Sequence, residues 1–286
     1  MPRFLSIGHV TRDRRPGGDV LGGSAAYAAL TARRLGWEVA VLTAAGPDFE
    51  PERELPGVDV FLLRSAATTR FVNTYDEDGT RHQTVVARAD DIDRTALTQD
   101  WLFPNALLLS PVAGDLCGVG DTALEAGSVG AVAQGWLREI GAGGDVSPRE
   151  WTRAGQDLLG VHVVVLSEQD LPDASAGARE LLRHVPMVAL TRGWRGLTLL
   201  TRQGEHEIPS LPRTESDPTG AGDVFAAAFL VRYHETANPP DAAAFAACAA
   251  SCAVEGVGAS SLGSREEVLR RIEMRERFLE EGEWDE

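Results

Sequence analysis

The chain has 286 residues, of which 43% are hydrophobic and 24% charged, a composition typical of a globular protein. Its 27 basic and 43 acidic residues give a formal net charge of −16, so general binding to nucleic acid or to an anionic membrane is not expected. All the basic residues are arginine. The absence of lysine excludes Schiff-base aldolases, pyridoxal-phosphate enzymes, Walker-A NTPases and protein kinases, because each needs a lysine side chain.

The cysteines and the N-terminal segment bear on the compartment. Cys248 and Cys252 lie four residues apart in an alanine-rich run, which predicts small buried apolar side chains on one helix face. No cysteine has the spacing of a metal site. The first residues do not resemble a signal peptide, and no window approaches the length of a membrane span. We therefore expect a cytoplasmic protein.

Short β-rich runs alternate with helical patterns along most of the chain. This alternation predicts an α/β fold with a mostly parallel central sheet. After residue 220 the pattern is helical only. The predicted strands are 4–10, 38–43, 106–111, 129–133, 162–166 and 187–190, and the predicted helices are 24–35, 173–183, 220–234, 241–255 and 265–280.

Residues 69–87 depart from this alternation. Two arms of alternating character flank Asp78 and Gly79, which predicts a β-hairpin with its turn at these two residues. The hairpin is either a lid over the edge of the sheet or a surface decoration. No linker divides the chain, so we expect a single domain over residues 1–286.

The most informative motif is Asp217-Pro218-Thr219-Gly220-Ala221-Gly222-Asp223, which runs directly into an apolar helical segment. Thr219 is a candidate N-cap of that helix. Gly220, Ala221 and Gly222 are small, so a phosphate can approach the free amides of the first helical turn closely.

Asp223 needs a separate explanation. A carboxylate in the first turn of a helix is favourable for the helix dipole, and that alone would account for it. An acid beside an anion-binding loop would nevertheless repel a phosphate. A general base that takes a proton from an attacking hydroxyl fits this arrangement, with the amides stabilising the transferred phosphoryl group.

The motif resembles the C-terminal signature of the ribokinase-like (PfkB) family of carbohydrate kinases, D-T/P-T-G-A-G-D. The resemblance implies a three-layer α/β sandwich with a small β lid, formed here mainly by about residues 66–88. It also implies phosphoryl transfer from ATP with Mg²⁺. Asp223 would be the catalytic base, with the amides of Gly220, Ala221 and Gly222 as the anion hole.

The N-terminal third extends the resemblance to the substrate site. Asp13, after the first strand, would hydrogen-bond substrate hydroxyls. Gly22 and Gly23 are similar to the family's di-glycine motif, in which the backbone approaches the sugar. Tyr27 stands where relatives carry a substrate-contacting asparagine. The short loop between Asp13 and Gly22 indicates that part of the ribokinase lid is missing.

The nucleotide side is implied by three further segments. Thr191, Gly193 and Gly196 match the T-x-G-x-x-G loop that passes close to ATP, and a hairpin is expected at 197–200 and 205–209. Gly256 and Gly258 match the loop that closes the adenine side, and Thr219 lies beside the phosphates. In relatives that use K⁺, the acid at the position of Asp217 and the carbonyls of Ala253 and Gly258 hold the ion.

Two segments depart from the family pattern. Ser167-Glu168-Gln169-Asp170 replaces N-x-x-E, so that Asp170 becomes the candidate magnesium ligand with a shorter side chain. Gln134-Gly135-Trp136 stands in the D-x-N-x-R stretch.

The preferred interpretation is a kinase acting on a sugar, sugar acid or cyclitol. One alternative is a nucleoside kinase, in which Tyr27, Phe71 or Trp136 would stack on the base. Another is a non-catalytic sugar or nucleotide sensor, suggested by the altered Ser167–Asp170 segment. Some relatives dimerise through the lid, so the expected partners are a small polyhydroxylated substrate and a second copy of the chain.

Overall fold

The central sheet is built from strands whose residues alternate between two apolar faces. The computed structural model describes residues 1–15, 17–75, 81–93, 96–116, 125–211 and 213–281. Within these residues the sheet has nine strands in the order β15-β14-β13-β12-β9-β8-β1-β4-β5. Its strands are β1 Arg3–Ile7, β4 Glu38–Ala45, β5 Asp59–Arg64, β8 Ala106–Leu109, β9 Ser128–Val132, β12 Val163–Ser167, β13 Met187–Thr191, β14 Leu197–Thr201 and β15 Gly204–Ile208.

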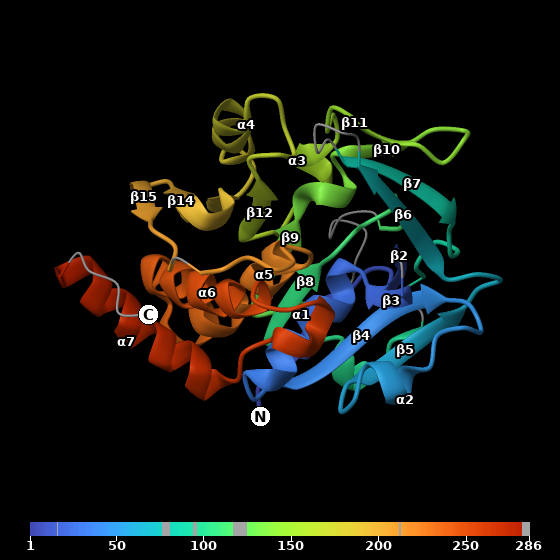
Figure 1. The fold of residues 1–286 in the computed structure, drawn as a ribbon, viewed down its shortest axis with the longest axis horizontal. Coiled ribbons are helices and arrows are strands. Elements are labelled where there is room, and N and C mark those ends of the chain that lie inside the picture. The colour runs from blue at the N-terminus through green and yellow to red at the C-terminus, as the bar shows by residue number, and fades with distance from the viewer. Residues whose placement is uncertain (16, 76–80, 94–95, 117–124, 212, 282–286) are drawn as a thin grey trace.

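The sheet is parallel from β5 to β13, whereas β14 pairs antiparallel with β13 and β15 pairs antiparallel with β14. Each strand of a sheet alternates its side chains, so Phe4 and Leu5 of β1 enter two different cores. Helices α1 (Ser24–Arg34), α5 (Ala221–Thr236) and α6 (Pro239–Ala253) supply one core, and α3 (Ala154–Asp157) and α4 (Ala174–Leu181) the other. Figure 1 shows the three layers, which confirms the predicted α/β sandwich.

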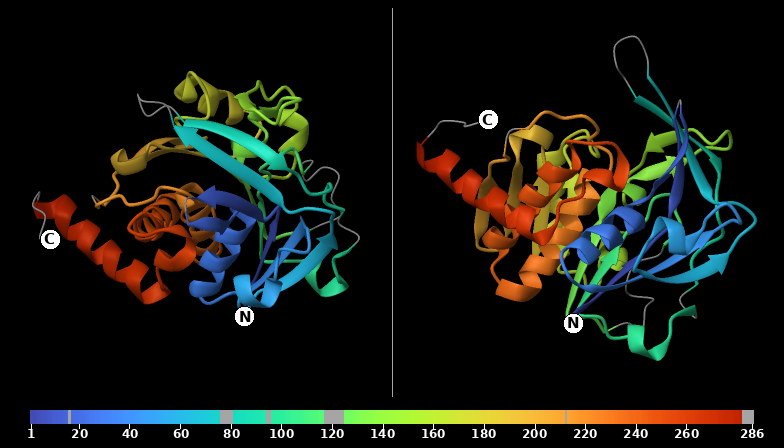
Figure 2. Two further views of the ribbon diagram at one scale, coloured as in Figure 1. Left: turned by 45° about the vertical axis from the view of Figure 1, so that its right-hand side comes forward. Right: turned by 60° about the horizontal axis from the view of Figure 1, so that its bottom comes forward.

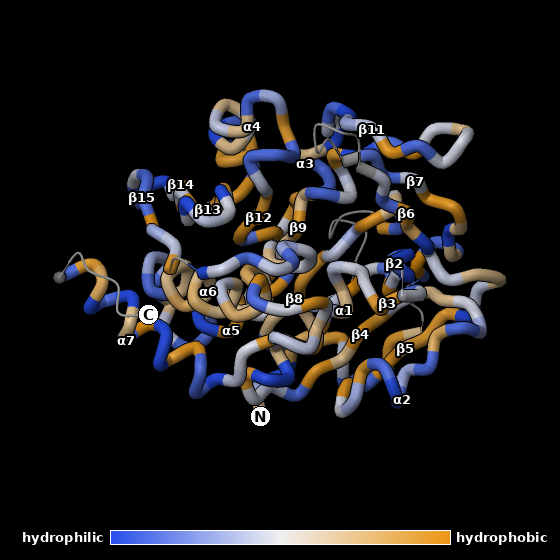
Figure 3. Tube along the Cα trace, viewed as in Figure 1, coloured by the Kyte–Doolittle hydropathy of each residue, from blue (hydrophilic) through white to orange (hydrophobic). Residues whose placement is uncertain are grey.

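The hydropathy of the chain follows this arrangement. Orange segments follow the central strands β4, β8, β9 and β12, whereas α7 (Arg265–Glu281), which packs on α6, is largely blue (Figure 3). In the described part of the chain, no helix is both long and apolar enough to span a membrane. Cys248 and Cys252 are buried in the α6 core, as predicted.

Every predicted strand and helix of the core is present, with ends that differ by at most three residues. Strand β5 and the short helix α2 (Pro51–Glu54) were not predicted. The predicted hairpin 69–87 forms β6 (Thr69–Tyr75) and β7 (Arg81–Ala87). Its expected turn at Asp78 and Gly79 lies outside the described residues.

A second, four-stranded sheet forms the lid. Strands β2 (Thr11–Arg15) and β3 (Gly18–Gly22) pair antiparallel, and β2 pairs with β6 in the order β3-β2-β6-β7. The segment between Asp13 and Gly22, expected as a short loop, instead forms most of the β2–β3 pair, because β2 bonds to β3 on one edge and to β6 on the other. Figure 2 shows the cyan β6–β7 pair beside the blue N-terminal strands, away from the red helix α7.

The lid sheet, defined as β2, β3, β6 and β7, is fastened to the body by Arg12. Its guanidinium donates to Glu54 Oε1 of α2 at 2.7 Å and to the carbonyl of Asp48. The side chains of Arg12 and Glu54 are both only 9% exposed. Because side chains of a strand alternate, Arg12 and Arg14 face one side of β2, and Asp13 and Arg15 face the other.

Arg12→Ala should destabilise the protein by about 3–5 kcal/mol, because it leaves the Glu54 carboxylate buried without its partner. Arg14 is the matched control, since it lies on the same strand with its side chain 56% exposed, and among the described residues it pairs with Asp19 alone. Arg14→Ala should cost at most about 1 kcal/mol. Urea unfolding measures both, and equal midpoints for the two variants would contradict the anchoring role of Arg12.

Candidate active site

Helix α5 begins at the glycine-rich motif. Gly220 is its N-cap, with φ +82°, and an added Cβ there would lie 2.5 Å from the ring of Tyr27. The amide of Ala221 donates to the carbonyl of Pro218 at 3.2 Å. The amides of Gly220 and Gly222 donate to no group of the described residues, which leaves two N–H groups at the positive end of the helix.

The expectation that Thr219 caps this helix is wrong. The cap residue is Gly220, and no side chain caps the helix. Thr219 instead donates its own amide to Asp217 Oδ1 at 3.0 Å. The left-handed conformation of Gly220 bends the chain sharply, so that the Asp217 carboxylate ties down the preceding loop instead. We call Asp217–Gly222 the signature loop.

Asp223 is a partly buried acid in the first turn of α5. Burial raises the pKa of its carboxyl to about 7, and the nearby acids Asp170 and Asp13 act in the same direction. A hydrogen bond from Ser24 and the charge of Arg138 act in the opposite direction. The carboxyl is therefore poised to gain or lose a proton near neutral pH, as a general base requires.

Asp170 lies at the carboxyl end of β12, on the same edge of the sheet. Its Oδ2 accepts from the amide of Ser167 at 2.7 Å, and Gln134, in the 3₁₀ turn η4 (Ala133–Gly135) after β9, also bonds it. Burial raises the pKa of Asp170, while the charge of Arg138 lowers it. Gln134, which stands where the family pattern has an aspartate, thus hydrogen-bonds the Asp170 carboxylate.

Arg138 was not among the predicted site residues. It begins β10 (Arg138–Ile140), which pairs with β11 (Val146–Pro148), and its charge acts on both Asp170 and Asp223. The absence of lysine could have pointed to it, since an anion site needs some cation. It is also the last residue of the stretch that corresponds to D-x-N-x-R.

The substrate-side residues Asp13, Gly22, Gly23 and Tyr27 are brought together with the signature loop. A Cβ on Gly22 would lie 2.6 Å from Asp13 Oδ2, and one on Gly23, the N-cap of α1 with φ +93°, would lie 2.5 Å from a backbone oxygen. Asp13 accepts from the hydroxyl of Thr11 at 3.1 Å. Tyr27 is buried, and its pKa is raised by burial and by Asp13, Asp217 and Asp223.

The lid sheet contributes a polar ladder that sequence reasoning missed. Asn73 of β6 and Gln83 of β7 are register partners, and Gln83 Nε2 donates to Asn73 Oδ1 at 3.0 Å. Arg138 then donates to Gln83 Oε1 at 2.8 Å. Asn73 and Gln83 therefore connect the lid to Arg138, whose charge lowers the pKa of Asp223. The only signal for them was the polar-apolar alternation of the hairpin.

The predicted donor loop lies next to Asp170. Thr191 ends β13, and the 3₁₀ turn η5 (Gly193–Arg195) leads to Gly196 and β14. The amide of Glu168 donates to the carbonyl of Thr191 at 2.9 Å, and Arg195 pairs with Glu168. A glycine is required at position 196 for packing alone, because an added Cβ would lie 2.2 Å from the carbonyl oxygen of Ile208. The Cβ side of Gly193 is open.

The loop after α6 adjoins the other end of the signature loop. The amides of Ser216 and Asp217 donate to the carbonyl of Val254 at 2.7 and 3.2 Å. Gly256 packs on Ser261 of the turn η6 (Gly258–Ser261), and the Cβ side of Gly258 is open. The predicted residues therefore meet along one edge of the molecule, except that no contact joins Gly193 or Gly258 directly to Asp170 or Asp223 in the described residues.

The donor set fits a magnesium ion held through water. Asp170 keeps one oxygen for Ser167, and Glu168 is paired with Arg195. Within the described ranges, no three His, Cys, Asp or Glu side chains cluster in a way that would hold a metal. Mg²⁺ commonly keeps several waters and binds by one or two carboxylates together with substrate phosphates, which this edge can provide through Asp170.

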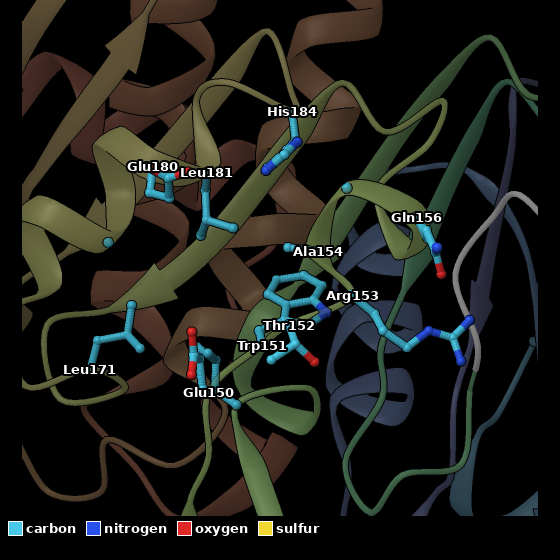
Figure 4. Close-up of a pocket in the computed structure, with 13 residues that line it drawn as sticks. Glu150, Trp151, Thr152, Arg153, Ala154, Gln156, Leu171, Glu180, Leu181 and His184 are labelled. Atoms are coloured by element: carbon cyan, nitrogen blue, oxygen red, sulfur yellow. The ribbon is translucent and has the colours of Figure 1, made fainter.

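A separate groove of about 510 Å³ lies between α3 and α4 (Figure 4). Trp151, Leu171, Leu181 and His184 are among the residues that line it. None of the predicted site residues lines it, and it belongs to the side of the sheet opposite α5. Trp151 stacks on Trp136 with ring centroids 4.8 Å apart, which fixes the wall of this groove. The groove is distinct from the edge that carries Asp170 and Asp223.

Sequence comparison finds a match to a known family in the C-terminal half of the chain. Residues 156–266 match the family described as pfkB family carbohydrate kinase. The bifunctional protein HldE of Shewanella sp. (strain W3-18-1) is 36% identical over 111 residues, which are 38% of this chain and 22% of HldE. The inositol 3-kinase of Arabidopsis thaliana is 33% identical over 79 residues, 28% of this chain and 22% of that protein. The matched segments thus span about a fifth of these curated relatives.

Structural similarity extends over nearly the whole chain. A pyrophosphate-dependent kinase in the ribokinase family, complexed with a pyrophosphate analog and myo-inositol, superposes with a TM-score of 0.76 at 22% identity and covers 93% of this chain and 99% of its own. The ribokinase of Thermotoga maritima gives 0.70 at 19% identity, covering 94% and 99%. The ribokinase of Arabidopsis thaliana, complexed with ribose and ATP, gives 0.70 at 19% identity, covering 95% and 98%.

The fold is therefore that of the ribokinase family. Residues 156–266, which carry the signature loop, Asp170 and Asp223, match the model of the pfkB family of carbohydrate kinases.

Asp223→Asn should make the protein more stable at high pH. A folded-state pKa of about 7, above the ordinary 3.8, means that ionising Asp223 costs stability as the pH rises from about 4 to 7. The variant removes this cost, so its advantage over the parent should grow to roughly 4 kcal/mol above pH 7 and vanish near pH 4. Urea unfolding between pH 4 and 8 measures it, with the exposed Asp59→Asn as control. A constant difference across this range would contradict the raised pKa.

Proposed function

We propose that the protein is a kinase that transfers the terminal phosphoryl group of ATP to a hydroxyl of a sugar, sugar acid or cyclitol. The observation that carries the proposal is the placement of Asp223, an acid with a pKa near 7, beside the free amides of Gly220 and Gly222. The pfkB match over residues 156–266 and the ribokinase fold support the same class.

The residues of the site have distinct roles in this reaction. Asp13, fixed by Thr11 next to the glycine pair, hydrogen-bonds the acceptor's hydroxyls. Asp223 takes the proton of the attacking hydroxyl as its oxygen forms a bond to the terminal phosphorus. The bond from that phosphorus to the bridging oxygen breaks, and ADP leaves. The amides of Gly220 and Gly222 and the charge of Arg138 stabilise the negative charge that spreads over the transferring group.

Magnesium fits this site as an ion held on the donor phosphates and through water at Asp170, where it would neutralise phosphate charge. Asp170 is the residue of this chain that orients the ion's water shell. The bonds from Ser167 and Gln134 hold its carboxylate in place for that purpose.

The acceptor is a polyhydroxylated ring rather than a nucleoside. A nucleoside kinase would need a free aromatic face for the base. Tyr27 packs on Gly220, Trp136 stacks on Trp151 and donates to the carbonyl of Leu116, and Phe71 is buried in a small cluster below the lid. The polar side chains that we propose to contact the acceptor are Asp13 and the Asn73–Gln83 ladder of the lid.

ATP is the proposed donor. The open Cβ sides of Gly193 and Gly258 leave room for a ligand along both loops that flank the signature loop. Trp194, 76% exposed on the donor loop, offers an apolar surface suited to a purine. A structural neighbour is nevertheless a pyrophosphate-dependent kinase, so the donor has to be tested together with the acceptor.

The test is phosphoryl transfer with Mg²⁺ and either ATP or inorganic pyrophosphate, over a panel of sugars, cyclitols, sugar acids and nucleosides. Acceptor-dependent conversion of ATP to ADP is expected with a sugar-like acceptor. Asp223→Asn should lower turnover by about a hundredfold to ten-thousandfold. Asp59→Asn, an exposed acid remote from the signature loop in sequence, is the matched control and should retain full activity.

Four results would overturn parts of this proposal. Near-normal turnover by Asp223→Asn would remove the assignment of the base. Turnover supported by pyrophosphate and not by ATP would correct the donor, and a preference for nucleosides would correct the acceptor. ATP binding without turnover on any acceptor would favour a sensor.

A further inference from the structure

Arg15, at the end of lid strand β2, reaches across the molecule to the signature loop. Its guanidinium donates to Asp217 Oδ2 at 2.7 Å, although the two residues lie 202 positions apart in the chain. The Asp217 side chain is only 9% exposed, and that of Arg15 is 29% exposed. Both oxygens of the Asp217 carboxylate are held, Oδ1 by the amide of Thr219 and Oδ2 by the guanidinium of Arg15.

The same acid is the one that the family resemblance assigns to a potassium ion, and its surroundings here do not suit such an ion. Asp217 Oδ1 accepts from Thr219 and Oδ2 from Arg15, so both oxygens are in use. The carbonyl of Ala253, a second expected ligand, accepts from the hydroxyl of Ser261 at 2.8 Å. A potassium site needs a ring of free oxygens that replaces the ion's water. A guanidinium in contact with one of them would repel the ion.

The position still requires a positive charge. An ionised Asp217 next to the free amides of Gly220 and Gly222 would oppose the binding of a phosphate. It would also be costly to leave unpaired in a buried place. A planar guanidinium suits this task, because it is always charged and can bond one carboxylate oxygen while keeping further N–H donors.

We propose that the guanidinium of Arg15 occupies the position of a monovalent cation beside the signature loop, so that this protein needs no potassium. Arg15 is then a positioning residue, since it acts through Asp217 and the signature loop. It belongs to the lid sheet, so this charge is in place only when β2 lies over the N-terminus of α5. The role in turnover rests on the proposed function, but the occupancy of the cation position does not.

The experiment compares four proteins: the parent, Arg15→Ala, the double variant Arg15→Ala/Asp217→Asn, and Arg14→Ala. Arg14 is the matched control, because it is the neighbouring arginine on the opposite face of β2. Melting temperatures are measured in KCl and in tetramethylammonium chloride at equal ionic strength. Arg15→Gln keeps most of the side-chain volume and serves if the alanine variant does not fold.

Potassium should raise the melting temperature of Arg15→Ala by on the order of 2 °C, because removing the guanidinium opens an oxygen-lined site next to Asp217. It should leave the parent, Arg14→Ala and the double variant unchanged. A potassium response of the parent would overturn the proposal. So would a folded Arg15→Ala that does not respond, or a double variant that responds as strongly as the single one.

Turnover provides a second readout. With the best acceptor of the panel, the parent should differ less than about twofold between the two salts. Arg15→Ala should lose at least about tenfold in tetramethylammonium and regain part of that in KCl. If no acceptor supports turnover, the proposed function fails, whereas the melting series still decides whether Arg15 occupies the cation position.

Discussion

An acid stands at the positive end of helix α5, where we propose that an anion binds, and the rest of the site is arranged around that conflict. Helix α5 presents two free amides at Gly220 and Gly222, and Asp223 follows in the same turn. Burial and the neighbouring acids raise its pKa to about 7, while Ser24 and Arg138 limit the rise. The carboxyl is thus neither permanently charged nor permanently protonated at physiological pH, which suits a group that must accept one proton in each turnover.

Positive charge in this site comes from arginine alone. Arg138 reaches the acids from β10 and is bonded to the lid through Gln83, and Arg15 reaches the signature loop from lid strand β2. Both arginines therefore connect the lid sheet with the N-terminus of α5. The position of the lid and the electrostatic field of the site are consequently coupled, and Arg12 on the opposite face of β2 fastens the same strand to the body.

Much of this was accessible from the sequence because it depends on local patterns. Apolar runs of four to eight residues predicted the core strands, and the small residues before an apolar helix predicted the anion loop with Asp223. The segment between Asp13 and Gly22 reads as a loop, since β2 is stabilised by pairing with β3 and with β6, which lies 58 residues further along the chain. The sequence suggests Thr219 as the cap because the left-handed conformation of Gly220 cannot be recognised from composition.

The missed site residues share a physical reason. Arg15, Arg138 and Gln83 act on partners that are distant in the chain, and nothing local marks an arginine as a site residue. Only the absence of lysine indicates that an arginine must supply the positive charge of the site. Which one does so depends on the topology that brings β2 and β10 to the same edge as α5.

The ionisation of Asp223 tests the central claim most directly. Carbon-13 NMR of the aspartate carboxyls, with Asp223→Asn to assign the resonance, follows this single group without any substrate. We expect it to titrate near pH 7 in the parent and at higher pH in Arg138→Gln, since the arginine favours the charged form. A titration near pH 4 that does not respond to Arg138→Gln would contradict the account.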